Sequence, residues 1–331
     1  MENDLCKSDR KVHGRKLYFD TLESELTFAE NPPAFEEPTV NDYRPSSQGG
    51  GAPGHSEIPQ RPLVVIKSGR RWTSLNLREL WAHRDLFYFL IWRDVKVRYK
   101  QTVLGVMWAI LQPLLTMMIF TFLFGHLARV PSDGMPYPIF VFAGLLPWNF
   151  FAAAVDNSSN SLVGNSALIT KVYFPRLVIP SAAVGAALVD FGIAFVILFF
   201  MGVHYNIGLS VGMLMLIPLI VQMTLFAVGI GIRMSALNVK YRDVRHALPF
   251  LINVWMYATP VIYPVSFIPD RLRWILVLNP LVGIIEGFRS AIFNRPFVWS
   301  HLVTSFVIVI AVLLYSLYSF RSMEKSFADI I

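Results

Sequence analysis

The chain has 331 residues, of which 54% are hydrophobic and only 15% are charged, and its formal net charge is +7. In soluble proteins charged residues make up about a quarter of the chain, so this composition excludes an ordinary soluble protein and indicates an integral membrane protein. No nucleic-acid-binding motif accompanies the positive charge, so we expect the basic residues to mark the cytoplasmic membrane face and expect no nucleic-acid partner.

The N-terminal part of the chain differs in composition from the rest. Residues 1–60 contain NPPAFEEP and RPSSQGGGAPGH, which are rich in proline, glycine, serine and charge and cannot bury enough apolar surface to fold. The N-terminal 25 residues lack the apolar run of a secretory signal. We therefore predict a disordered cytoplasmic extension at 1–60. The chain's single cysteine, Cys6, lies in it, so no intramolecular disulfide can form.

Residues 61–104 are predicted to form a cytoplasmic interfacial segment that contains an amphipathic helix. Apolar residues such as Leu77, Leu80 and Trp81 are interspersed there with arginines and lysines. This pattern is typical of a helix that lies in the plane of the membrane surface. The last cations of the segment are expected where the phosphate of an anionic lipid would be; they are Arg93, Lys96, Arg98 and Lys100.

Six later segments are apolar enough to cross the membrane, which takes about 20 residues of helix. Basic residues such as Lys171, Arg176 and Lys240 follow the even-numbered segments, whereas the short loops on the other side hold only Arg129. The basic side is expected to be cytoplasmic, which places both termini in the cytoplasm. The sequence thus predicts an all-α integral membrane protein with a domain at 105–325 and spans at about 105–126, 138–156, 178–202, 211–233, 247–265 and 301–320.

The segment before the last span does not fit a simple loop. Residues 266–300 are apolar but are interrupted by proline and by charged residues. We expect a pair of short re-entrant helices, because irregular backbone at membrane depth is tolerated only where protein or a wet cavity satisfies it. A seventh span within 274–293 is the alternative, but it would place the basic C-terminal residues outside. Glu286 and Arg289 are three residues apart and are expected to neutralise each other on one helix face.

Catalytic and nucleotide-binding motifs are absent from the sequence. No G-x-x-x-x-G-K-[ST], G-x-S-x-G or H-E-x-x-H pattern occurs, and the seven histidines stand singly without metal-ligand spacing. We therefore expect neither catalysis nor a bound metal in this chain. Asp190 is the most central ionisable residue of an apolar block. We expect it either to face a wet cavity or to make a hydrogen bond or ion pair between helices.

Several segments together resemble one family, the membrane subunits of type 2 ABC exporters that move polysaccharides or polyol phosphates. They include AGLLPWNFF, NSLVGNSALITKVYFPRLVIP, SALNVKYRDVRHALPFL, TPVIYPVSFIP and LNPLVGIIEGFRSAIF, and the resemblance covers about residues 72–325. It implies a homodimeric permease of the bacterial inner membrane with a translocation path between the subunits. It also implies two copies of a separate ABC ATPase subunit, which bind ATP and Mg²⁺, and a membrane-borne glycan such as O-antigen or capsule as cargo. No cofactor is expected in this chain.

Three other functions are weighed against this one. The first is an ABC exporter of a small solute or lipid, which would share the same architecture. The second is a membrane-embedded glycosyl or acyl transferase, which needs a base or nucleophile, and only Asp190 and Glu286 come close. The third is a structural scaffold, which the number of family motifs disfavours.

The resemblance gives a role to NSSNSLVGNSALITKVYFPRLVIP, residues 157–180. A helix around 166–173 would enter a groove of the ATPase as the family's coupling helix, with Leu168 and Val172, or Ile169 and Tyr173, one turn apart. The alternative is a solvated loop that reaches back to its own bundle. The predicted contact residues are Asn165, Leu168, Thr170, Lys171, Tyr173, Phe174 and Arg176. A second cytoplasmic contact, or an anchor for helix ends at the headgroups, is predicted at Tyr241, Arg242 and Asp243.

Aromatic residues make up 14% of the chain and provide candidates for a glycan path. A sugar chain can slide over aromatic faces without being held at one site, whereas the alternative role is the aromatic belt at the membrane interface. The resemblance also suggests a lipid pyrophosphate as ligand for the four interfacial cations, with phospholipid anchoring as the alternative. The predicted path residues are Trp148, Phe150, Phe151, Asp190, Trp255, Tyr257 and Tyr263.

Overall fold

The structure is a computed structural model that describes residues 83–100, 105, 107–171, 174–208 and 210–330. The predicted extension at 1–60 and the first part of the interfacial segment, with Leu77, Leu80 and Trp81, lie outside the described residues.

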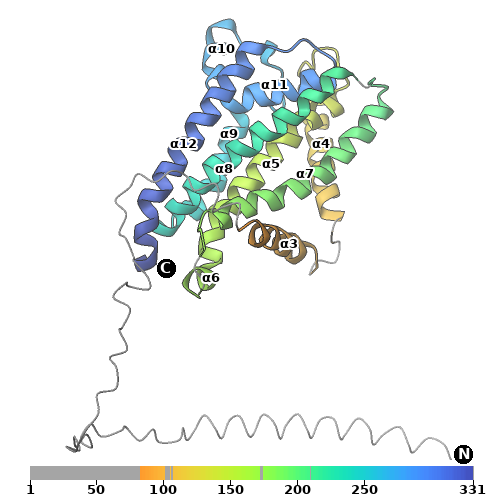
Figure 1. Ribbon diagram of the computed structural model, residues 1–331. Coiled ribbons are helices and arrows are strands. Elements are labelled where there is room, and N and C mark those ends of the chain that lie inside the picture. Colours follow the sequence, from red (N-terminus) through yellow and green to blue (C-terminus); the bar gives the residue numbers. More distant parts are fainter. Residues whose placement is uncertain (1–82, 101–104, 106, 172–173, 209, 331) are drawn as a thin grey trace, which may run out of the picture. The chain divides into compact units, whose positions relative to one another are not determined.

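Helices follow one another along the described part of the chain, and no strand occurs in it (Figure 1). Short turns and loops join them. In chain order they are α3 (Arg84–Lys100), α4 (Met107–Phe120), the π-helix η1 (Thr121–Leu127), α5 (Tyr137–Gly164), α6 (Ser166–Lys171), α7 (Val178–His204), the 3₁₀ helix η2 (Val211–Met215), α8 (Leu216–Lys240), α9 (Val244–Tyr257), the 3₁₀ helix η3 (Val265–Phe267), α10 (Asp270–Val277), α11 (Pro280–Ile292) and α12 (Trp299–Ile330).

Among the described residues, five helical segments are long and apolar enough to cross a membrane. They are α4 with η1, α5, α7, η2 with α8, and α12 as far as Glu324. The pair α10 and α11 would provide a sixth if it were one span, but it is bent by 101°. The predicted all-α integral membrane fold is confirmed, and the two short helices expected within 266–300 are present as α10 and α11.

The predicted span at 247–265 is wrong in its bounds. Its helix, α9, has 14 residues and ends at Tyr257, so at 1.5 Å per residue it is about 21 Å long, short of the roughly 30 Å of the hydrocarbon core. Pro260 accounts for the end of the helix, because proline disfavours a helical conformation at the residue before it, here Thr259. The apolar run continues beyond this point without continuing the helix.

The centre of the bundle is α5, which Figure 1 shows between α7, α8 and α11. In its most apolar window 78% of the residues are buried, whereas none are buried in the corresponding window of α4 and η1. A helix that is hydrophobic on all sides packs in the interior. Phe151 of α5 stacks on Phe226 of α8 with ring centroids 5.1 Å apart, and Trp255 of α9 meets Phe151 edge-on at 5.3 Å.

A second apolar cluster lies at the end of the bundle that holds α3 and α6 (Figure 1). We call it the α3–α6 cluster. It joins one face of α3 to α6, to the start of α7 and to the ends of α5, α8 and α12. Its buried members are Leu90, Leu162, Phe174, Leu177, Val178, Ile179, Ala182, Ile232, Ala236, Val239 and Phe320, and the partly buried residues packed on them include Leu86, Phe87, Ile91, Leu168 and Ile169.

Candidate functional site

The predicted coupling segment contains a helix, α6, that follows α5 directly. Asn165 ends α5, and its side-chain amide donates a hydrogen bond to the carbonyl of Ser161 at 2.7 Å. The hydroxyl of Thr170 donates within α6 to the Ser166 carbonyl at 3.2 Å. Leu168 and Ile169 pack into the α3–α6 cluster. The segment is helical, as predicted, and is not the solvated loop of the alternative, but the apolar face of α6 faces its own bundle.

Two residues predicted to contact an ATPase point elsewhere. Phe174 is only 6% exposed, because its ring packs in the α3–α6 cluster. Arg176 donates from Nη1 to the carbonyl of Glu324 in α12 at 3.0 Å, so it joins the segment to the C-terminal helix. The prediction of an outward role for Phe174 is therefore corrected. Val172 and Tyr173 lie outside the described residues.

The exposed side of α6 offers a different set of side chains. We call it the α6 surface, and it consists of Ala167, Thr170 and Lys171 together with Val163 from the last turn of α5, all exposed. It is small and mildly apolar around a single cation, so a partner can approach the backbone closely there. Because Leu168 and Ile169 on the other face of α6 are partly buried against the α3–α6 cluster, a force applied to the α6 surface acts directly on the bundle.

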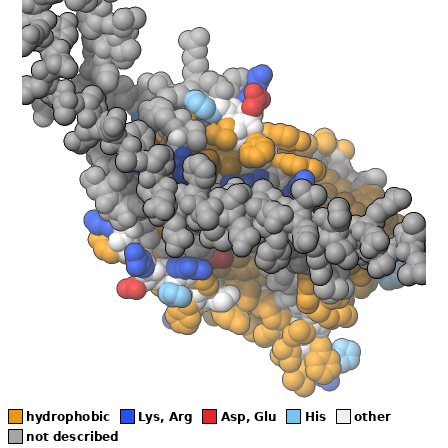
Figure 2. All heavy atoms as spheres, turned by 90° about the horizontal axis from the view of Figure 1, so that it is seen from below, with side chains coloured by type: hydrophobic (Ala, Val, Ile, Leu, Met, Phe, Trp, Pro, Cys, Tyr) orange, Lys and Arg blue, Asp and Glu red, His pale blue; other side chains and the backbone are white. Residues whose placement is uncertain are grey.

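The second predicted contact lies in the turn between α8 and α9. Tyr241, Arg242 and Asp243 are all exposed, and Nζ of Lys240 lies 5.2 Å from the centroid of the Tyr241 ring. Arg245, at the start of α9, is exposed as well. Figure 2 views the molecule from this end and shows lysine and arginine side chains gathered there. This charge distribution suits an acidic partner surface.

An ion pair joins α3 to the middle of α7. Nη1 of Arg98 and the hydroxyl of Tyr99 both donate to the carboxylate of Asp190. Asp190 is twelve residues beyond the start of α7 at Val178, about 18 Å along the helix. Burial raises the pKa of Tyr99, against the opposing effect of Arg98, so the hydroxyl keeps its proton and acts as a donor. The pairing is the interhelical alternative weighed for Asp190.

A second contact between α3 and α7, in addition to the ion pair, is a close approach of the two helices. A Cβ added to Gly185 of α7 would lie 2.6 Å from Cδ1 of Ile91, so the glycine lets this isoleucine pack directly on the α7 backbone. Ile91 and Arg98 are two turns apart on α3, and Gly185 and Asp190 lie along the same stretch of α7. The two contacts therefore hold α3 along α7, with its other end in the α3–α6 cluster.

The four interfacial cations divide into two kinds. Arg93 bonds to the neighbouring carboxylate of Asp94 at 2.7 Å, and Arg98 is held by Asp190. Lys96 and Lys100 are exposed and have no ion pair within the described part. The two lysines follow the exposed aromatic residues Tyr88, Phe89 and Trp92 along α3. Aromatic rings beside cations on one helix face suit a lipid headgroup region.

Three of the seven predicted path residues are interior residues. Trp148, Phe150 and Phe151 are at most 3% exposed, so they belong to the core of the bundle and do not line an open path in the described part of the chain. This prediction is corrected, because α5 is the central helix. Tyr257 is 62% exposed at the end of α9. Tyr263 donates from its hydroxyl to the Tyr257 carbonyl at 3.0 Å, and Trp255 is half-buried against Phe151 and Phe226.

The sequence reasoning missed the exposed face of α9. Phe250, Val254 and Tyr257 are each at least 50% exposed, and they recur at spacings of four and three residues, so they share one helix face. The opposite face is buried through Leu248 and Ile252. The helical period of the segment was the signal that would have found this apolar face, because it separates the two sides of α9.

Arg289 binds backbone and not Glu286. It is 6% exposed and donates from Nη1 to the carbonyl of Pro260 at 2.8 Å and from Nη2 to that of Val261 at 2.6 Å. Its guanidinium also lies 3.9 Å from the centroid of the Phe140 ring. Glu286 makes no ion pair within 4.0 Å in the described part, so the predicted mutual neutralisation is wrong as a direct contact. Arg289 therefore acts as a clamp that holds the backbone carbonyls of Pro260 and Val261 just beyond the end of α9.

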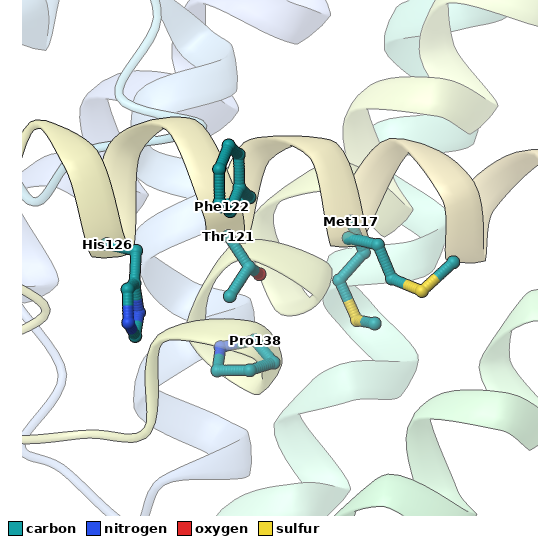
Figure 3. Close-up of a pocket in the computed structure, with 6 residues that line it drawn as sticks. Met117, Thr121, Phe122, His126 and Pro138 are labelled. Carbon is teal, nitrogen blue, oxygen red and sulfur yellow. The ribbon is translucent and has the colours of Figure 1, made fainter.

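The end of α4 winds as the π-helix η1, an irregularity often found at functional sites. It borders a cavity of 340 Å³. Figure 3 shows Thr121 and His126 on the side of η1 that faces Pro138 of α5. The hydroxyl of Thr121 is buried and makes no hydrogen bond in the described part. Methionines and Phe122 complete a mostly apolar lining, suited to a lipid chain or to another protein helix.

Comparisons with known proteins agree on one family. The model of the ABC-2 type transporter family matches residues 85–293. The O-antigen export system permease protein RfbA of Myxococcus xanthus is 31% identical over 259 residues, which cover 76% of this chain and 98% of the relative. A protein of the same name from Klebsiella pneumoniae is 33% identical over 252 residues, 75% of this chain and 95% of its own. The polysialic acid transport protein KpsM of Escherichia coli is 24% identical over 206 residues, 61% and 79% of the two chains.

Proposed function

Because the chain belongs to the ABC-2 type transporter family, we propose that it is the permease subunit of an ATP-driven exporter that moves a lipid-linked polysaccharide across the bacterial inner membrane. The observation that carries this proposal is the similarity to O-antigen export permeases over three quarters of the chain (76% for the M. xanthus relative). The multi-pass helical fold agrees with it. The chain is a transport subunit and not an enzyme.

A separate ABC ATPase is the proposed motor, in two copies that bind ATP and Mg²⁺. The sequence has no P-loop, and the α6 surface together with the turn at Tyr241–Asp243 offers exposed contacts, with Lys171 and Arg242 as cations, at one end of the bundle. A push on α6 would pass through Leu168 and Ile169 into α3 and α7. This end is then cytoplasmic, as the basic residues suggest, and both termini lie on that side.

Blocking the α6 surface is expected to prevent the ATPase from binding while the permease stays folded. The double variant Ala167→Glu/Lys171→Glu places two acids where a small residue and a cation are exposed, so like charges face an acidic partner. We expect at least about a tenfold loss of affinity, or about 1.4 kcal/mol, in a titration of purified permease with the ATPase. As the control, Arg84→Glu changes an exposed cation outside the α6 surface and should bind normally. Equal affinity for wild type and the double variant would contradict the assignment.

A homodimer is proposed because two surfaces of the bundle are apolar and exposed. No residue is buried in the most apolar window of α4 and η1, and α9 presents Phe250, Val254 and Tyr257. A second copy would cover these faces and would enclose a polar path that one bundle is too small to form. The purified permease should therefore have a protein mass of twice 37.6 kDa by native mass spectrometry. A single-copy mass at micromolar concentration would contradict the dimer.

The free lysines of α3 are proposed to bind an anionic lipid headgroup, of the substrate or of a phospholipid. Lys96→Gln and Lys100→Gln should each weaken binding of phosphatidylglycerol by about fivefold, since one basic residue near the surface contributes about 1 kcal/mol. Native mass spectrometry of the permease with added lipid measures this. Arg93→Gln is the matched control, because Arg93 is already paired with Asp94, and it should change binding less. Equal effects of all three variants would contradict the distinction between free and paired cations.

The transferase alternative loses one of its two candidate bases. Asp190 is held by Arg98 and Tyr99 and is not available to accept a substrate proton. The names of the relatives favour a polysaccharide over a small solute as cargo.

Deletion of the gene tests the proposed function in cells. Lipid-linked glycan should accumulate on the cytoplasmic side, and the wild-type gene should restore surface glycan. Normal surface glycan in the deletion strain would contradict the proposal.

A further inference from the structure

A cavity of 440 Å³ opens at the end of the bundle opposite α6. Three chain segments form it: the residues before α5 with Met135, the link from α7 to η2 with Tyr205 and Asn206, and the residues after α11 with Phe293 and Asn294. The volume lies in the range of small-molecule sites and exceeds that of one sugar ring. The exposed face of α9 does not contribute to it, so it is separate from the proposed path between subunits.

The groups in this cavity are polar, aromatic and uncharged. None of the described lining residues is acidic or basic. Tyr205 and Phe293 are half-buried rings, whereas Asn206 and Asn294 are exposed. The side-chain amides of Asn206 and Asn294 and the hydroxyl of Tyr205 make no hydrogen bond to other described residues. The hydroxyl of Ser210 accepts from the amide of Gly212 at 3.0 Å and retains its own proton to donate.

Both asparagines have a left-handed backbone conformation. Their φ angles are +53° at Asn206 and +53° at Asn294, a region that asparagine tolerates better than most residues. Glycine would serve the same turn at no steric cost. Replacing each asparagine with glycine therefore keeps the backbone conformation and removes only the side-chain amide.

The chemistry of the lining selects a class of ligand. Amide side chains both donate and accept hydrogen bonds, which matches the hydroxyls of a sugar, and an aromatic ring covers the apolar face of a pyranose. Phosphate, sulfate or carboxylate ligands would need a charged partner, which the described lining lacks. We propose that this cavity is a subsite for a neutral sugar residue of the exported glycan at the outer end of the permease. The inference rests on the proposed function, which supplies the glycan as ligand and the outward direction of transport.

Binding of neutral sugars to the full chain tests the subsite. Saturation-transfer-difference NMR on the permease in phospholipid nanodiscs, free of sugar-based detergent, uses neutral trisaccharides of glucose, galactose, mannose and rhamnose, with trisialic acid as the charged probe. At least one neutral trisaccharide should receive saturation. Asn206→Gly/Asn294→Gly should weaken its binding by about tenfold, since two hydrogen bonds are lost, and Tyr205→Leu should weaken it as well.

The control is Arg129→Gly, an exposed residue at φ +50° that does not line the cavity, and it should bind sugar like wild type. The subsite is overturned if no neutral trisaccharide binds, if the double glycine variant binds like wild type, or if trisialic acid binds equally well. The measurement needs neither ATP nor the ATPase. Sugar binding without export would therefore refute the proposed function alone, and export by a permease that binds no sugar would refute the subsite alone.

Discussion

Replacing Asp190 with leucine is expected to lower the free energy of unfolding by about 2 kcal/mol. Removing one partner of a fully buried ion pair costs about 3–5 kcal/mol, and the side chains of Arg98 and Asp190 are 32% and 26% exposed, so solvent screening reduces the loss. Arg98 is left without its carboxylate, and α3 keeps only its apolar contacts with α7, which include Ile91 against Gly185 and the α3–α6 cluster. Chemical unfolding followed by tryptophan fluorescence measures the change.

The same substitution should reduce ATP-driven export by about tenfold, because residues that transmit motion change coupling by about 0.5–2 kcal/mol. The α3 helix shares a cluster with α6 at one end and leads toward α4 at the other, so a loosened α3 transmits less of the movement of α6. ATP hydrolysis by the complex should fall less than export does. Export and hydrolysis that fall in proportion would contradict a transmitting role for the link.

A double-mutant cycle isolates the pair. Arg98→Leu and Asp190→Leu together should destabilise the protein by less than the sum of the single effects, with a coupling of about 1 kcal/mol or more. Asp94→Leu is the matched control, because the ion pair that Asp94 makes in the described part of the chain is with the adjacent Arg93 on the same helix, and its effect should stay within about 0.5 kcal/mol. Additive effects of the two leucine substitutions would show that the ion pair contributes no stability.

Gly144→Ala is expected to destabilise the fold by about 2 kcal/mol. The added Cβ would lie 2.5 Å from the carbonyl oxygen of Val261 and 2.8 Å from Nη2 of Arg289. Overpacking in a filled interior typically costs about 1–3 kcal/mol, and here it also disturbs the hydrogen bond between these two groups. Gly192→Ala is the control, since its Cβ would meet nothing within 4 Å.

Gly192→Ala should raise the free energy of unfolding by about 0.5–1 kcal/mol, because alanine has a higher helix propensity than glycine. Arg289→Met provides a second variant of the clamp, since it removes the donors to Pro260 and Val261 without adding volume beside Gly144. It should destabilise to a similar degree, because buried carbonyls lose their partners. Equal stability of the Gly144 and Gly192 variants would contradict a tightly closed clamp.

Hydropathy was sufficient to predict the membrane class, and five of the predicted spans overlap helical segments that are long and apolar enough to cross a membrane. Hydropathy was not sufficient for α9, because the apolar run through 247–265 continues past Thr259, where Pro260 ends the helix. The aromatic residues of α5 were interpreted as path residues because they lie near a span end. Only the three-dimensional packing reveals that α5 is central and that Trp148 and Phe151 are core residues.

Contacts between distant residues explain the other differences. Arg98 and Asp190 are 92 positions apart, and Arg289 reaches carbonyl groups nearly 30 positions away. Periodicity describes neighbours on one helix, so it paired Arg289 with Glu286 on the same helix. It also assigned Leu168 and Ile169 of α6 to two alternative faces, whereas both residues pack against the same cluster.

Reconstitution of export tests the central claim most directly. The permease and its ABC ATPase are placed in lipid vesicles with labelled lipid-linked glycan, and the labelled glycan that crosses the bilayer is measured with and without ATP. We predict ATP-dependent transfer that requires both proteins and is lost in Ala167→Glu/Lys171→Glu. Transfer that proceeds without ATP or ATPase, or no transfer by an assembled wild-type complex that hydrolyses ATP, would contradict the account.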